Sequence, residues 1–528
     1  MAKIIRPVVL IPGLAGSRIK TKERPTYRDN LWMSLEMLQL LPKDQSNQQS
    51  EEVSQQSAPS VVGFNVPEYE IKAEETPDPG AEWKRHMKVN VYVGKSNIID
   101  GVTPLVEVEE RELGADGEPN QYNKPVEGLE GIENFLPNIP FTEYNTRYYE
   151  ELVYTLTREY KDFSGETKSD YRKNENVVGA PYDWRIAPGG LEVRYSYFTN
   201  LKEEIEKLYQ NSGGTILNPR KRVVIIAQSM GNRVTQYFLQ WVKNTQLDDG
   251  KVWGQEWIDQ HIYRYIAVSP PWLGAPMSIR MLVTDDGLKI GTAALSGMKE
   301  VIQSYSSVPW LLPVTQEHYQ YFNTQHFGFL KKGSEQTKDG FTPIDIKTTL
   351  EKGGANSTLA YLEKFYETNP LITQAEGEFG DKLVECPPVE NLSVIYSTGF
   401  PTAVGAYYEE VDGGLKVADY LGKDENGLLS PLPDGKFIIR NGVRVETSDT
   451  LQTIDNERNS GDGIVPYGSL TYFKKWQKDP EITATTNIKG YAFQGGVSSH
   501  SEILRDPRVI TRILILIGLL EPPKGEEI

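Results

Sequence analysis

A serine stands where a strand-like apolar run meets a helix-like segment. Residues 222–228 are rich in Val and Ile, Ser229 follows at once, and 233–242 has the apolar spacing of an amphipathic helix. Strand, sharp turn and helix in this order form a nucleophile elbow, in which the turn lifts a serine hydroxyl clear of the backbone. Ala227 and Gly231 are small enough to let strand and helix approach closely, although the spelling is AxSxG rather than GxSxG. The alternative interpretation of Ser229 is an ordinary helix N-cap.

Strand-like and helix-like segments alternate along much of the chain, which predicts an α/β fold with a mostly parallel, doubly wound sheet. Two segments interrupt the alternation. Residues 43–139 form a polar insertion that we expect to be partly disordered and a candidate membrane-proximal subdomain, and 300–390 are expected to form a cap or lid. The predicted α/β-hydrolase core then consists of 1–42, 140–299 and 391–528.

Composition excludes several classes of function. The formal charge of −17 argues against nucleic acid as a partner. A single cysteine and only five histidines, with no HExxH pattern, give no support for a metal site, and no cofactor is predicted. No signal peptide is legible, and the longest apolar run, 513–520, is far shorter than the ~20 residues that span a bilayer. We therefore expect a soluble protein and favour a cytoplasmic location.

A serine nucleophile needs a base and an acid, which follow it in the chain order Ser, Asp or Glu, His in this class of fold. Asp462 lies between two glycines just before an apolar run. His500 lies between a strand-like run and the last helix, which is expected over 502–520. The alternatives are a plain Gly-Asp-Gly turn for Asp462 and a histidine at a helix N-terminus for His500. The order Ser229, Asp462, His500 predicts a catalytic triad.

Acyl transfer also needs backbone donors for an oxyanion. The N–H of Met230, directly after the nucleophile, is the first candidate. The loop after the first strand, Pro12-Gly13-Leu14-Ala15-Gly16, supplies the second, for which we choose the N–H of Leu14. Alone, this Pro-Gly-x-x-Gly pattern is typical of a turn, and its value comes from its place after the first strand of the same sheet.

Eight segments, in order, resemble the lecithin:cholesterol acyltransferase family, which includes the lysosomal phospholipase A2 and the phospholipid:sterol and phospholipid:diacylglycerol acyltransferases. They are Val8–Gly13, Leu31–Met33, Gly179–Arg185, Ala227–Gly231, Ser269–Ala275, Tyr396–Thr402 with Tyr407–Glu409, Gly461–Pro466 and Ser499–Leu504. They cover most of the chain outside the two insertions.

The resemblance implies a nucleophile at Ser229, an acid at Asp462, a base at His500 and oxyanion donors at Leu14 and Met230. It implies that Asp183, the rival acid, supports the framework of the site. The animal enzymes close a membrane-contacting loop with a disulfide near the N-terminus, and this chain has no cysteine there.

The function that follows is a lipid acyl hydrolase or acyltransferase. It would act peripherally on a phospholipid membrane or lipid-particle surface and pass the acyl group to water, a sterol or diacylglycerol. A soluble-substrate carboxylesterase or thioesterase with the same triad is the first alternative, and a catalytically inactive binding protein the second. We expect the lipid-facing surface to be built from apolar side chains of the cap and of the helix-like run 31–41. The side chains are Tyr305, Trp310, Leu311, Leu312 and Phe322, together with Leu31, Trp32 and Met33. The alternative is that this aromatic and aliphatic cluster belongs to the core.

Overall fold

The fold is described from a computed structural model of the chain. The residues that the structure describes are 5–20, 30–32, 84, 87–89, 124–134, 147–161, 167–213, 221–245, 250–285, 289–290, 293–294, 298–313, 326–332, 340–368, 372–374, 382–418, 430–431, 437–446, 460–494 and 499–526. Most of the predicted insertion 43–139 lies outside these ranges, so its boundaries stay a prediction.

A six-stranded sheet forms the centre of the molecule, in the order β22-β16-β9-β8-β1-β7. Every neighbouring pair in it is parallel. The strands are β1 (Val8–Ile11), β7 (Val177–Gly179), β8 (Val223–Gln228), β9 (Ile262–Val268), β16 (Asn391–Thr398) and β22 (Asn487–Gln494). All residues of β1, β8 and β16 are buried, as expected for strands that are covered on both faces.

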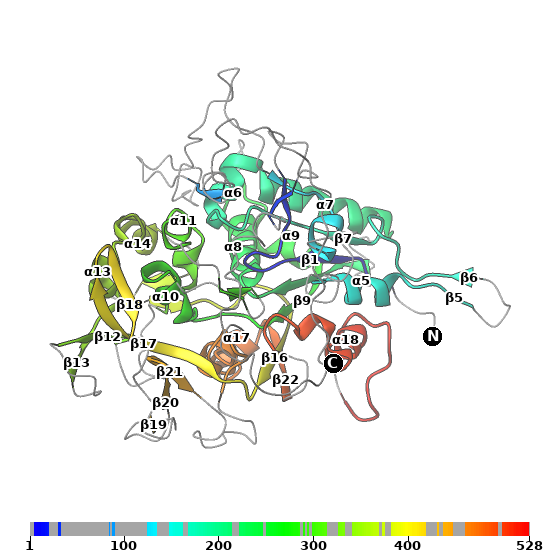
Figure 1. Cartoon of the computed structure of the whole chain (residues 1–528). Helices are drawn as coiled ribbons and strands as arrows, with labels where there is room; N and C mark the ends of the chain where they lie inside the picture. The colour runs from blue at the N-terminus through cyan, green and yellow to red at the C-terminus, as the bar shows by residue number, and fades with distance from the viewer. Residues whose placement is uncertain are drawn as a thin grey trace, which may run out of the picture.

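Helices cover both faces of this sheet. Since successive side chains of each strand point in opposite directions, one strand contributes to two separate cores. Val8 and Leu10 of β1 pack in one core with α5 (Glu150–Thr157) and α18 (Pro507–Leu516). Val9 and Ile11 pack in a second core with the helices α7 (Tyr197–Asn211), α8 (Gly231–Asn244) and α9 (Gly254–His261). Figure 1 shows α7 above the sheet and α18 below it. The predicted α/β class with a mostly parallel, doubly wound sheet is confirmed.

The strand order brings the loops after β1 and β8 to one edge of the sheet. The chain leaves β1, passes α3 (Glu130–Glu133) and α5 on one face, and enters β7. It then passes α6 (Pro188–Tyr195) and α7 on the other face and enters β8, on the opposite side of β1. Where consecutive connections leave on opposite faces, a crevice opens at the carboxyl ends of the strands. The loop after β1 and the turn after β8 both lie at that edge.

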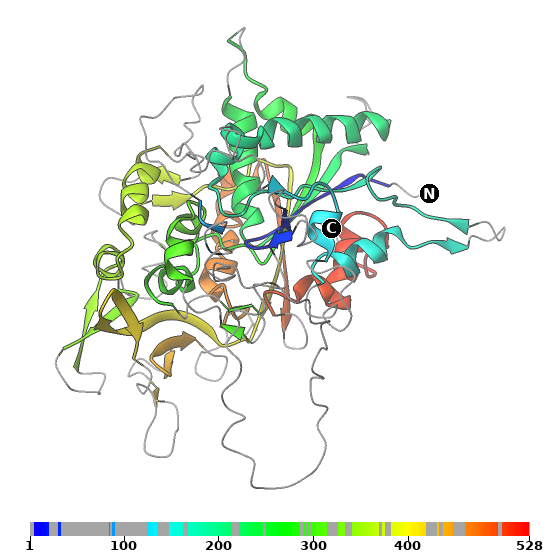
Figure 2. The same cartoon turned by 45° about the horizontal axis from the view of Figure 1, so that its top comes forward.

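A second, seven-stranded sheet has the order β13-β12-β17-β21-β20-β19, with β18 paired to β17. Its strands are β12 (Gly328–Lys331), β13 (Phe341–Ile344), β17 (Thr402–Val411), β18 (Gly414–Val417), β19 (Ser430–Pro431), β20 (Phe437–Arg440) and β21 (Val443–Glu446). It lies at the left of both views, beside α10 (Met277–Val283) and α13 (Ile346–Lys352) (Figures 1 and 2). Strands β12 and β13 of the predicted cap, 300–390, therefore share one sheet with strands that follow position 390.

Two local expectations need correction. The last helix, expected from 502 to 520, is divided into a 3₁₀ turn, Ile503–Arg505, and α18. Pro507 explains the break, since proline cannot continue a helix but suits the first position of a new one, here capped by Asp506. The helix expected over 31–41 begins instead as a strand, β3 (Asn30–Trp32), and 33–41 lie outside the described residues.

Candidate active site

Ser229 occupies the turn between β8 and α8 with a φ of 53°, a left-handed conformation that is uncommon for residues other than glycine. Its N–H donates to the carbonyl oxygen of Val268 on β9, at 3.0 Å. Gly231 begins α8, and a Cβ at this position would lie only 2.3 Å from the carbonyl oxygen of Pro12. The helix therefore packs directly on the loop after β1, which is why the elbow requires a glycine there.

Asn232 is a buried residue of the elbow that the sequence patterns did not point to. Its side-chain nitrogen donates to the carbonyl oxygens of Ser229, at 2.9 Å, and Val268, at 3.1 Å. Its side-chain oxygen accepts from the hydroxyl of Tyr265, at 2.7 Å. Asn232 thus ties the strained turn to the neighbouring strand. The only hint in the sequence was an amide side chain three residues after the serine.

The structure brings the three predicted side chains together. His500 Nε2 lies 2.8 Å from Ser229 Oγ, and His500 Nδ1 lies 2.7 Å from Asp462 Oδ2. A carboxylate only accepts, so Nδ1 carries the proton and Nε2 presents the lone pair that accepts from the serine hydroxyl. Asp462 is fully buried and His500 is 8% exposed, whereas Ser229 is partly exposed. This is the geometry of a nucleophile, base and acid in series.

Backbone donors hold the carboxylate of Asp462 in place. Its Oδ1 accepts from the N–H groups of Val465, at 2.8 Å, and Ile464, at 3.1 Å. Its own carbonyl oxygen accepts from the N–H of His500, at 2.9 Å, so Asp462 and His500 are joined through backbone as well as side chain. The Gly-Asp-Gly segment is therefore a turn, but a turn that aims its carboxylate at an imidazole.

The second sheet supports this acidic loop. Glu446, at the end of β21, is fully buried, and its Oε1 accepts from the N–H groups of Gly461, at 2.7 Å, and Tyr467, at 2.8 Å. Thr402, at the start of β17, accepts from the N–H of Gly463 at 3.0 Å. Thr402 and Glu446 are direct partners in the pairing of β17 with β21, and only this pairing reveals that they support the loop of Asp462 together.

Asp183 lies in a different environment. It is fully buried and forms two hydrogen bonds of 2.8 Å with Arg185, through Nε and Nη2, and one of 3.0 Å with the hydroxyl of Tyr195. Burial alone would raise the pKa of Asp183, but the Arg185 guanidinium outweighs burial and lowers it. Among the described residues, no hydrogen bond joins Asp183 to His500. This geometry supports the structural role that the resemblance implied.

The two candidate oxyanion donors border the elbow. Met230 precedes α8, so its N–H belongs to the positive end of that helix. The loop of Leu14 is fixed on both sides. The carbonyl oxygen of Gly13 accepts from Gly16 N–H at 3.0 Å, and the carbonyl oxygen of Ala15 accepts from Trp32 Nε1 at 2.9 Å. Within the described residues, neither the Leu14 nor the Met230 amide donates a hydrogen bond. Their role as oxyanion donors stays a prediction.

The aromatic residues expected at a lipid surface are core residues instead. Trp32 is 1% exposed, and besides bonding to Ala15 its ring packs edge-on against Trp184, with centroids 4.9 Å apart. Trp310 and Leu311 are 4% and 7% exposed, and the carbonyl oxygen of Leu311 accepts from the N–H of Ala275. Tyr305 and Leu312 are buried too, while Leu31, Met33 and Phe322 have no described side chain. The hydrogen bonds and ring packing of these residues hold the scaffold of the site.

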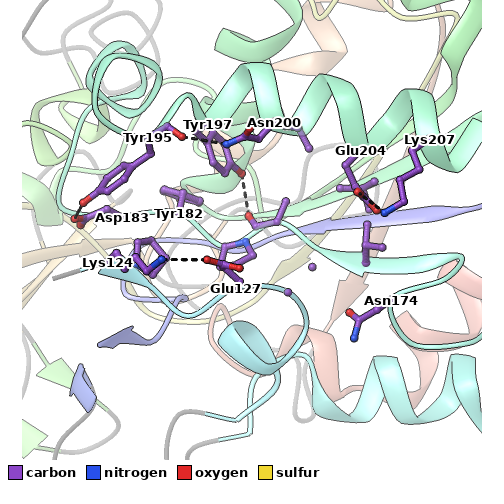
Figure 3. Close-up of a pocket in the computed structure, with 18 residues that line it drawn as sticks. Lys124, Glu127, Asn174, Tyr182, Asp183, Tyr195, Tyr197, Asn200, Glu204 and Lys207 are labelled. Atoms are coloured by element: carbon purple, nitrogen blue, oxygen red, sulfur yellow. Dashed lines mark hydrogen bonds and ion pairs between the residues drawn. The ribbon is translucent and has the colours of Figure 1, made fainter. Parts of the chain in front are cut away.

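A cavity of about 620 Å³ opens at the β7 edge of the sheet. Figure 3 shows the residues that line it, none of which belongs to the predicted triad or oxyanion donors. Its two lysines each lie beside a glutamate, Lys124 at 3.2 Å from Glu127 and Lys207 at 3.3 Å from Glu204. The third carboxylate of the lining, Asp183, is bonded to Arg185, which lies outside the lining.

Among the described residues, no helix is both long and apolar enough to cross a bilayer. The same part of the chain has no group of three or more His, Cys, Asp and Glu side chains that could hold a metal ion.

Comparison with known proteins identifies the family. A sequence model of the lecithin:cholesterol acyltransferase family matches residues 165–507, a span that contains Ser229, Asp462 and His500. The chain belongs to the lecithin:cholesterol acyltransferase family. This match confirms the resemblance predicted from the eight segments. It begins after the loop of Leu14, so the family match does not cover that candidate donor.

Three similar members of the family act on lipids, as their names state. The human lysosomal phospholipase A and acyltransferase is 33% identical over 247 residues, or 45% of this chain and 48% of the relative. The phospholipid–sterol O-acyltransferase of Arabidopsis thaliana is 27% identical over 363 residues, 58% of this chain and 53% of the relative. The phospholipid:diacylglycerol acyltransferase of Saccharomyces cerevisiae is 25% identical over 329 residues, 57% and 45%. The chain thus spans about half the length of these relatives.

Proposed function

We propose that this chain is a serine-dependent lipid acyl hydrolase or acyltransferase. It cleaves a fatty acyl ester of a glycerophospholipid through an acyl-enzyme on Ser229. The observation that carries this proposal is the unbroken series from Ser229 Oγ through His500 to Asp462, with contacts of 2.8 and 2.7 Å. Family membership supports the substrate class, because the similar members are named for phospholipids.

In the first half of the reaction, Ser229 Oγ attacks the ester carbonyl carbon while its proton passes to His500 Nε2. The carbonyl oxygen becomes an oxyanion, and the N–H groups of Leu14 and Met230 are the proposed donors to it. The imidazolium is stabilised by the Asp462 carboxylate, which its Nδ1–H already contacts. Collapse breaks the bond to the leaving oxygen. That oxygen takes the proton from Nε2 and departs as the alcohol of a lysophospholipid.

In the second half, water or a lipid alcohol gives its proton to His500 Nε2 and attacks the acyl-enzyme. The new ester or free acid forms as the bond to Ser229 Oγ breaks, and the proton returns from Nε2 to the serine. Hydrolysis and transfer use the same residues and differ only in which acceptor reaches the acyl-enzyme. A sterol or diacylglycerol, presented at a membrane or lipid-particle surface that the enzyme binds peripherally, is the proposed alternative to water.

A soluble ester or thioester is the competing substrate class. The burial of Trp310 and Leu311 favours it, because these residues do not form the apolar surface that a bilayer substrate was expected to need.

The test is product analysis by mass spectrometry, with phospholipid liposomes supplied with and without a sterol or diacylglycerol, and with a short soluble ester in parallel. We expect lysophospholipid together with fatty acid or a new acyl ester, and no product from Ser229→Ala. Turnover of the soluble ester with none of liposomes would replace the phospholipid assignment by the soluble one. Unchanged turnover in Ser229→Ala would overturn the nucleophile.

A further inference from the structure

The loop after β1, the elbow and the loop of His500 come from three distant parts of the chain, yet one series of buried hydrogen bonds joins them. The N–H of Gly13 donates to the hydroxyl of Tyr148 at 2.9 Å. That hydroxyl donates to Gln228 Oε1. The side-chain nitrogen of Gln228 donates to the carbonyl oxygen of His500 at 3.0 Å. Neither Tyr148 nor Gln228 has a part in the reaction proposed above.

The series has a fixed direction, because each member can fill only one role. A tyrosine hydroxyl has one proton, so once it accepts from Gly13 N–H its proton goes to the Gln228 oxygen. An amide that accepts at its oxygen then presents its N–H₂ on the other side, where the His500 carbonyl lies. Tyr148 therefore selects one orientation of the Gln228 amide, and that amide holds the backbone of the base.

Packing makes the series rigid. Tyr148 and Gln228 are 9% and 2% exposed. A Cβ on Gly13 would lie 2.6 Å from Gln228 Oε1 and 2.8 Å from Ser229 Cβ, and one on Gly16 would lie 2.8 Å from the Tyr148 ring. The loop after β1 thus rests on the Tyr148 ring, with its backbone against the serine. Gly16, which rests on this ring, also donates its N–H to the carbonyl oxygen of Gly13, and that oxygen shares one planar peptide group with the N–H of Leu14.

We propose that Tyr148 and Gln228 are positioning residues. They hold the candidate oxyanion donor Leu14 and the proposed base His500 at fixed positions relative to Ser229 and to each other. The proposal rests on the proposed acyl-transfer function. The two residues are expected to stabilise the transition state of acylation, in which the oxyanion and the imidazolium form together. Their loss should therefore lower the rate of acylation and leave substrate binding nearly unchanged.

The chain contains a matched control. Tyr149 is adjacent to Tyr148, is fully buried, and donates its hydroxyl to the carbonyl oxygen of Ile11 at 2.9 Å. Its bond ends on strand β1 rather than on the oxyanion loop. The two rings pack against each other with centroids 4.9 Å apart, so Tyr148→Phe and Tyr149→Phe each remove one oxygen from the same aromatic pair. A purely structural role for both tyrosines would give two similar variants.

The experiment compares the full-length protein with Tyr148→Phe, Tyr149→Phe, Gln228→Met and the double variant Tyr148→Phe/Gln228→Met. It measures kcat and KM on a short soluble ester, thermal unfolding, and affinity for a trifluoromethyl ketone, whose adduct with serine places an oxyanion in the site. Since loss of one direct oxyanion donor costs about 10²–10³ in kcat, we expect about 10- to 100-fold for Tyr148→Phe, with KM within about 3-fold. Ketone affinity should fall in parallel with kcat, and Tyr149→Phe should stay within about 3-fold of wild type.

The double variant distinguishes a connected series from two separate contacts. If the two residues act through one another, it should be no slower than the worse single variant by more than about 3-fold. Equal kcat for the Tyr148→Phe and Tyr149→Phe variants, or multiplicative effects in the double variant, would overturn the positioning role. If Tyr148→Phe fails to fold, Gln228→Met decides alone, because unchanged kcat and ketone affinity there would refute the proposal. Failure of the proposed function looks different, because wild type itself would then turn over no ester and a fluorophosphonate would not label Ser229.

Discussion

Asp183 and Asp462 are both fully buried carboxylates in loops of the same core, yet their partners differ. Asp183 is held by a guanidinium through two bonds and by a phenol. Asp462 is held by two backbone N–H groups and leaves its second oxygen to an imidazole. An arginine keeps its charge at any accessible pH, whereas a histidine gains and loses a proton near neutrality. The partner, rather than burial, therefore separates a carboxylate that stabilises the fold from one that can assist proton transfer.

The largest effect is expected from Asp462→Asn. The amide keeps the size of the side chain but removes the charge that favours protonated His500 and fixes its tautomer. We expect kcat on a short ester to fall by about 10⁴, by analogy with other triads, with KM and thermal stability much less affected. Steady-state kinetics and thermal unfolding of the purified variant would check this. A loss below about 10-fold would mean that Asp462 is not the acid.

The converse change is Asp183→Asn. It leaves Arg185, which is 1% exposed, as a buried cation without its carboxylate. Breaking one side of a buried ion pair typically costs about 3–5 kcal/mol, so we expect a loss of that order in the free energy of unfolding. The kcat of the remaining folded protein should change by less than about 10-fold. Chemical denaturation followed by active-site titration would measure both quantities. If Asp183→Asn instead lost activity with unchanged stability, the two aspartates would have exchanged roles.

A smaller effect is expected from Glu446→Gln, which tests the brace behind Asp462. The glutamine keeps an oxygen for the N–H groups of Gly461 and Tyr467 but loses the charge that strengthens both bonds. We expect a stability loss of about 1–3 kcal/mol and a kcat reduced by roughly 10-fold, because the acidic loop loosens without losing its carboxylate. Chemical denaturation and kinetics on the same preparation would test it. A kcat equal to that of wild type would show that the second sheet does not influence the acid.

The sequence predicted what depends on local pattern and chain order. Alternating strands and helices indicated the parallel sheet, and the small residues around Ser229 indicated the tight turn after β8. The order of Ser229, Asp462 and His500 predicted three side chains that the structure places in contact. These features are encoded by neighbours in the chain, so one sequence suffices to read them.

What the sequence could not reveal depends on contacts between distant segments. Glu446 and Thr402 reach Asp462 only because β17 and β21 pair in a second sheet, and Tyr148 reaches Gln228 across 80 positions. Trp310 and Leu311 were misread for a related reason. An aromatic, aliphatic cluster has the same composition whether it faces lipid or a neighbouring helix, and only burial decides between the two.

The smallest predicted effect concerns acid stability and separates the aspartates without any assay of activity. Because Arg185 holds the pKa of Asp183 below its ordinary value, the unfolded chain takes up this proton at a higher pH than the folded protein. The stabilisation from Asp183 is therefore fully present above the ordinary aspartate pKa of about 3.9 and is lost as the pH falls below it. One such group adds a slope of up to about 1.4 kcal/mol per pH unit, so wild type should lose on the order of 1 kcal/mol more than Asp183→Asn between pH 4 and pH 3. Urea denaturation at a series of pH values would measure the difference. If the free energies of unfolding of the two proteins fell in parallel as the pH is lowered, Arg185 would not be lowering the pKa of Asp183 in the folded state.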